Sequence, residues 1–138
     1  MILVSLYSAY AQPALAFDKG TDKAAMKGLL AEIPESYFEG VSAIYFTDTP
    51  YRYNRGNQLT VGMYYRDSIT LYDVDSFSYE YVKEILLHEL GHSRWARLSE
   101  EEQEAYCNGE VTDECEEKFA DGFAESNSSK SDIVGAAA

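Results

Sequence analysis

The chain has 138 residues, the size of one domain, and 46% of them are hydrophobic and 25% charged. This composition is typical of a globular protein and excludes a collagen, a coiled coil and a fully disordered chain. The 11 Lys and Arg residues against 24 Asp and Glu give a net charge of -13, which argues against a nucleic-acid partner. The two cysteines allow at most one bridge, and both histidines lie within residues 88–92.

The first 17 residues carry no charge and need to be distinguished from a targeting segment. No basic residue precedes Lys19, and Gln12 and Pro13 interrupt the apolar run, so a buried strand or helix is favoured over a signal peptide. The run is also too short to span a bilayer. We therefore expect no membrane span, and a cytoplasmic location is slightly favoured over secretion.

The first half of the chain predicts one helix followed by strands. A helix is expected over residues 22–33, where apolar side chains recur at helical spacing. Residues 38–46 are rich in β-branched and aromatic side chains and predict a strand. After a turn at residues 55–57, strands near 59–66 and 68–72 are joined tightly enough to form a hairpin.

Three helices are predicted in the second half, over residues 79–97, 99–109 and 112–125. Each begins at a residue type that caps helices; the candidates are Ser76 or Ser78, Ser99 with Glu102 as a capping box, and Thr112 or Asp113. The element order predicts an α+β fold with one domain over residues 1–125. Residues 126–138 are small and polar and are expected to form a flexible tail.

Residues 88–92 read His-Glu-Leu-Gly-His within the longest predicted helix. Positions four apart leave the same face of a helix, so His88 and His92 can bind one Zn²⁺. Glu89 lies one step round the helix and can reach a water molecule on the metal without binding the metal itself. Gly91 is a poor helix former, which indicates that another element packs closely against it.

Two histidines do not complete a catalytic zinc site, which needs three protein ligands. The chain has no third histidine, so the third ligand is a carboxylate or a cysteine. Residues 117–121 read Glu-Lys-Phe-Ala-Asp and place two carboxylates one helical turn apart, with Ala120 small enough to lie against Gly91. The residues that compete with Glu117 for the ligand role are Asp113, Glu114, Cys115 and Glu116.

With this pair of motifs the sequence resembles the gluzincin metallopeptidases, and in length it is similar to their single-domain members, the minigluzincins. The resemblance covers about residues 59–125. It implies a zincin-like α+β fold, in which a small antiparallel or mixed sheet packs on an active-site helix and a glutamate helix. It assigns His88, His92 and Glu117 as zinc ligands, and Asp121 as the acceptor that orients a ligand histidine.

The resemblance also implies a function: a zinc-dependent endopeptidase that hydrolyses peptide bonds through a metal-bound water, with Glu89 as general base. The expected partner is a peptide or protein substrate, and the protein is expected to be a monomer. Tyr106, the only tyrosine between the two motifs, is the candidate donor to the oxyanion. The strand residues Gly62, Met63 and Tyr64 correspond to the strand that pairs with the substrate backbone.

Two alternatives remain open at the level of the sequence. The protein could be a catalytically silent zinc-binding module with a regulatory or interaction role, although Glu89 argues against it because a structural site needs no base.

Cys107 and Cys115 flank the turn between the last two helices and would form a bridge in an oxidising compartment. Inside a cell they are expected to be free thiols.

Overall fold

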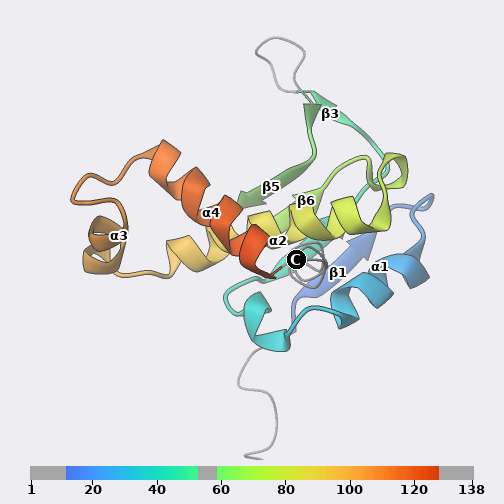
Figure 1. The fold of residues 1–138 in the computed structure, drawn as a ribbon. Helices are drawn as coiled ribbons and strands as arrows, with labels where there is room; N and C mark the ends of the chain where they lie inside the picture. The colour runs from blue at the N-terminus through green and yellow to red at the C-terminus, as the bar shows by residue number, and fades with distance from the viewer. Residues whose placement is uncertain (1–11, 53–58, 128–138) are drawn as a thin grey trace, which may run out of the picture.

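The computed structural model describes residues 12–52 and 59–127, and Figure 1 shows the arrangement of their helices and strands. The elements in chain order are β1 (Ala14–Phe17), α1 (Lys23–Ala31), the 3-10 helix η2 (Glu35–Phe38), β2 (Ala43–Phe46), β3 (Tyr51–Arg52), β4 (Leu59–Thr60), β5 (Gly62–Tyr65), β6 (Ser68–Leu71), the 3-10 helix η3 (Val74–Ser76), α2 (Tyr79–Ala96), α3 (Glu100–Tyr106) and α4 (Asp113–Asn127). The predicted α+β fold is confirmed. Residues 1–11, the predicted turn at 55–57 and residues 128–138 of the predicted tail lie outside the described residues.

A four-stranded mixed sheet of order β1-β2-β6-β5 forms one layer, as predicted for a small mixed sheet. β1, β2 and β6 run parallel, and β5 returns antiparallel to β6 through the tight turn at Arg66 and Asp67, both with positive φ. Apolar side chains of β2 and β6 are buried in one core with those of α1 and α2. β5 is the last strand in this order and is therefore an edge strand; it lies beside α2.

Three predicted strands differ from the structure. Residues 38–46 form a strand only from Ala43, because η2 and the left-handed Gly40 (φ +82°) interrupt the extended chain before it. The strand predicted over residues 59–66 is divided between β4, which pairs with β3, and β5 of the main sheet. The N-terminal run does contain β1, but this strand is exposed at the sheet edge and is not buried as predicted.

The helix ends follow the capping residues. The Ser78 side chain accepts a hydrogen bond from the backbone of Tyr81 and begins α2, which settles the choice against Ser76. Ser99 and Glu102 form the predicted capping box of α3. Thr112 accepts from the Cys115 N–H at 3.1 Å and caps α4, which runs two residues past its predicted end. Within residues 12–52 and 59–127, no helix combines the length and the apolarity that crossing a bilayer requires.

Candidate metal centre

The candidate site lies where α4 crosses α2, as Figure 1 shows. Gly91 of α2 faces Ala120 of α4, and a Cβ atom added to Gly91 would lie 2.8 Å from the Ala120 Cα and 3.1 Å from its carbonyl oxygen. The predicted close packing of these two residues is therefore confirmed. Only a glycine lets the helix backbones approach this far, and this approach brings the carboxylates of α4 to the histidines of α2.

The described residues contain one group whose ligand atoms could hold a metal ion: His88, His92 and Glu117, with one atom from each within 4.8 Å of the others. The two Nε2 atoms are 3.2 Å apart. Glu117 faces both rings, with Oε2 3.2 Å from His88 Nε2 and Oε1 3.1 Å from His92 Nε2. The ligand atoms of a tetrahedral metal site lie about 3.3 Å apart when each is about 2.0–2.1 Å from the ion, so the group could hold a metal ion.

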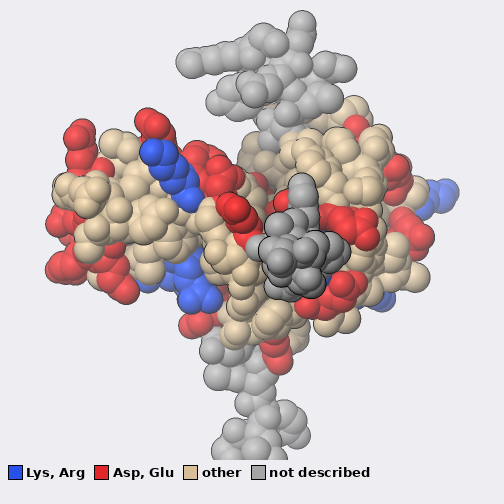
Figure 2. Space-filling model, viewed as in Figure 1, with Lys and Arg blue, Asp and Glu red and all other residues tan. Residues whose placement is uncertain are grey.

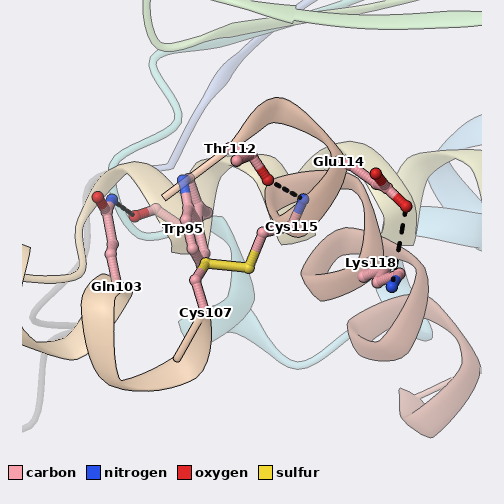
Figure 3. The surroundings of a disulfide bond; sticks show 7 residues. All are labelled: Trp95, Gln103, Cys107, Thr112, Glu114, Cys115 and Lys118. Carbon is pink, nitrogen blue, oxygen red and sulfur yellow. Dashed lines mark hydrogen bonds and ion pairs between the residues drawn. A yellow bond between two sulfur atoms is a disulfide. The ribbon is translucent and has the colours of Figure 1, made fainter. Parts of the chain in front are cut away.

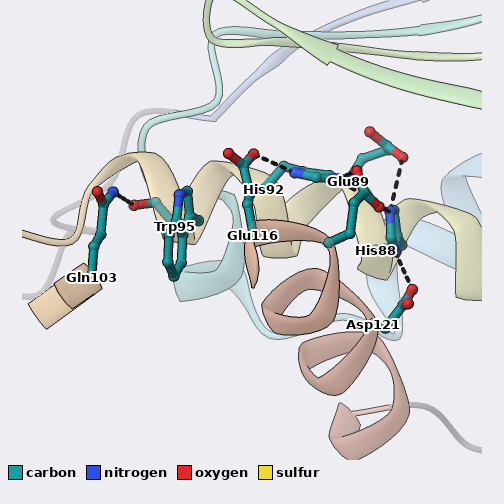
Figure 4. A network of polar contacts seen from close by, with 8 residues as sticks. His88, Glu89, His92, Trp95, Gln103, Glu116 and Asp121 are labelled. Carbon is teal, nitrogen blue, oxygen red and sulfur yellow. Dashed lines mark hydrogen bonds and ion pairs between the residues drawn. The ribbon is translucent and has the colours of Figure 1, made fainter. Parts of the chain in front are cut away.

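The outer nitrogen of each ring contacts a carboxylate (Figure 4). His88 Nδ1 lies 2.9 Å from Asp121 Oδ1, and His92 Nδ1 lies 2.6 Å from Glu116 Oε2. A carboxylate only accepts hydrogen bonds, so each of these contacts uses a proton on Nδ1, and the Nε2 atom of each ring faces Glu117. Two imidazole nitrogens and one carboxylate therefore converge on one place, a set of ligand types that could hold a metal ion.

Glu89 is buried beside this group, with 6% of its surface exposed and its Oε2 atom 3.9 Å from His88 Nε2. Burial raises the pKa of Glu89 to about 7, the His88 ring lowers it, Glu117 raises it, and a hydrogen bond from the Tyr64 backbone N–H lowers it. A cation held by the histidines would favour the carboxylate, since opposite charges attract. Glu89 is thus placed to exchange a proton near neutral pH.

The predicted substrate strand lies next to Glu89. A Cβ atom on Gly62 would lie 2.6 Å from Ile85 Cγ2 and 3.1 Å from Glu89 Cγ, so the glycine lets β5 pack closely on α2. The backbone groups of Tyr64 point away from β6, because Tyr65 and Ser68 form the hydrogen-bonded pair next to the two-residue turn. The structure therefore brings Gly62 and the Tyr64 backbone to Glu89. The contact of Gly62, Met63 and Tyr64 with a substrate stays a prediction.

Tyr106 lies in an aromatic cluster with residues of α2 and α4, and its expected role as oxyanion donor stays a prediction. Its ring packs against Trp95 and Phe119, with centroids 5.9 and 5.2 Å away, and 47% of its surface is exposed. Among the described residues, no contact joins Tyr106 to the two histidines. The structure supports a packing role for Tyr106, because its ring closes the end of α3 onto α2 and α4.

The residues that compete with Glu117 also have distinct positions. Cys115 is bonded to Cys107, so the bridge left open by the sequence is formed (Figure 3). Glu114 points to Lys118, 3.9 Å away on the same helix. Glu116 contacts the outer nitrogen of His92, a role that the sequence reasoning missed. The signal in the sequence was the number of acceptors, because each ligand histidine needs one at its outer nitrogen and the resemblance assigns only Asp121.

Replacement of Glu116 by alanine is expected to weaken zinc binding by about 10–100-fold, because His92 loses the acceptor that fixes its ring and tautomer. Glutamine should restore part of the affinity, since its amide oxygen accepts the same hydrogen bond. Competition with a chromophoric chelator measures both values. The control is Glu114→Ala, which removes the same charge from an exposed side chain; equal affinities of the two alanine variants would contradict the role of Glu116.

The electrostatic setting of the site is acidic. On the face drawn in Figure 2, acidic side chains lie over α3 and along α4, where basic side chains are few. The side chains of Glu117 and Asp121 are 58% and 73% exposed, so the carboxylate side of the group is open to solvent. Negative potential around an open site attracts cations and is expected to speed the arrival of a divalent metal ion.

Comparisons with known protein families, with curated proteins and with solved structures find no significant match to this chain.

Proposed function

We propose that the protein is a zinc-dependent endopeptidase with a zincin-like arrangement of its two central helices. One observation carries the proposal: both histidines bond carboxylates through Nδ1 and turn Nε2 toward Glu117. This leaves two imidazole nitrogens and one carboxylate as ligands, the donor set of a hydrolytic zinc site with an open position. Glu89, buried beside the set, supplies the base that a purely structural zinc site does not need.

Different residues of the chain have different roles in the proposed hydrolysis. A bound zinc ion supplies Lewis acidity, which polarises a substrate carbonyl and makes a water molecule acidic near neutral pH. Glu89 takes up the proton of the attacking water and returns it to the leaving amine. Asp121 and Glu116 accept hydrogen bonds from Nδ1 of His88 and His92, which fixes the two rings with Nε2 directed at the place that the metal would occupy.

The edge strand β5 supports a peptide as the substrate. It pairs with β6 on one side only within the described part of the chain. An extended peptide can add to such an edge through main-chain hydrogen bonds. These bonds do not depend on side chains, so peptides of many different sequences can bind in this way. Because Tyr64 also bonds Glu89, a peptide on this edge would lie beside the proposed base.

Metal content and peptide cleavage, measured on the same preparations, test this function. The wild-type protein is expected to contain about one zinc per chain and to cleave members of a peptide library, to lose cleavage with a chelator and to regain it with added zinc. The His88→Ala/His92→Ala variant should lack both properties. Zinc binding without cleavage of any peptide would instead support the silent zinc-binding module, and cleavage by the double variant would contradict the proposed site.

A further inference from the structure

The part of α4 that carries Glu116 and Glu117 has little burial to hold it in place. The first buried side chain of this helix is Ala120; among the seven residues before it, Phe119 packs on Trp95 and Tyr106, and none is fully buried. The opening turn of a helix lacks intrahelical partners for its N–H groups and tends to fray. In this turn the Thr112 side chain satisfies one N–H group, that of Cys115.

The contacts between α4 and the histidines begin in this part of the helix. Glu116, Glu117 and Asp121 of α4 all point to the histidines of α2, and Glu89 lies beside them. Glu116 and Glu117 lie before the first buried residue of α4, so motion at the beginning of the helix would carry both carboxylates away from the histidines. A tether close to Glu116 and Glu117 would restrict this motion.

The Cys107–Cys115 bridge has the position of that tether (Figure 3). Cys115 directly precedes Glu116, and Cys107 follows the last residue of α3. α3 is itself held on α2, because the Gln103 side chain donates to the Trp95 carbonyl at 2.9 Å. The bridge therefore connects the beginning of α4 through α3 to Trp95 in the last turn of α2, three residues beyond His92.

We infer that the Cys107–Cys115 bridge positions Glu116 and Glu117 for metal binding, so that the redox state of the bridge and the metal affinity of the site are linked. This inference rests on the metal centre of the proposed function. When two thiol groups of a reductant reduce the bridge, Cys107 and Cys115 become free thiols and the two reductant sulfurs form a disulfide with each other. By reciprocity, zinc must stabilise the bridge by the same factor by which the bridge strengthens zinc binding.

The test compares zinc affinities by chelator competition. The Cys107→Ser/Cys115→Ser variant lacks the bridge and cannot bind zinc through a thiol; we expect it to bind zinc at least about tenfold more weakly than the oxidised wild type. Asp22→Ala is the control, because it removes the cap of α1, far from the bridge in the sequence, and should change the affinity less than about threefold although it costs about 1 kcal/mol of stability. Circular dichroism establishes that each variant is folded.

A second measurement separates the outcomes. In a glutathione redox buffer, saturating zinc is expected to shift the thiol–disulfide equilibrium of the wild type toward the bridge. A shift toward the thiols would overturn the inference and point to cysteine ligation of the metal. Equal, tight binding by the wild type and the serine variant would overturn the linkage alone, whereas no zinc binding by any form would overturn the metal centre as well.

Discussion

Glu89→Gln is expected to bind zinc as the wild type does and to cleave peptides about 10²–10⁴-fold more slowly, the range that a general base contributes. Glutamine has the shape of glutamate, so the packing of this buried side chain against β5 is kept. Its amide cannot take up a proton from water near neutral pH. The loss should therefore appear in kcat, measured with a fluorogenic peptide found in the library.

Glu80→Gln is the matched control for this experiment. It removes the same charge from an exposed position at the beginning of the same helix. Cleavage by this variant should stay within about threefold of the wild type, because screened surface charges contribute little. If Glu89→Gln kept wild-type kcat, Glu89 would not be the base, and the proposed division of roles at the site would be wrong.

Gly91→Ala is expected to lower the free energy of unfolding by about 1–3 kcal/mol, the usual cost of overpacking a tight interior contact. The added methyl group would meet the Ala120 backbone, which cannot rotate away as a side chain can. This cost exceeds the helix propensity that alanine gains over glycine, about 1 kcal/mol. Because Glu117 precedes Ala120 by three residues, the displaced helix should also bind zinc more weakly.

Gly122 of α4 is expected to give the opposite result. A Cβ atom at this exposed position meets nothing within 4 Å, so Gly122→Ala should stabilise the protein by about 0.5–1 kcal/mol and leave zinc affinity unchanged. Urea unfolding of the three proteins measures both free-energy changes. A stabilising effect of alanine at both positions would show that the helices separate at no cost, against the packing described above.

Local patterns were sufficient to predict the α-helices and two of the three candidate metal ligands, His88 and His92. The two histidines lie four residues apart on one helix, so the helical repeat alone brings them together. The capping box at Ser99 and Glu102 also depends only on nearby residues. Strands were predicted less well: β1 lies at an exposed edge, and β4 and β5 belong to different sheets, because strand pairing depends on segments distant in the sequence.

The sequence by itself determined that two imidazoles leave one helix face with a glutamate one step round the helix, and that the glycine among them needs a close neighbour. Only the tertiary structure decided which carboxylate faces both histidines. Asp113, Glu114, Glu116 and Glu117 carry the same chemical group, and the way in which α4 crosses α2 determines which of them reaches both rings. The tertiary structure also placed Tyr106 in an aromatic cluster and joined Cys107 to Cys115. Those outcomes depend on how three helices approach one another, and this approach is a property of the packed core that no short segment encodes.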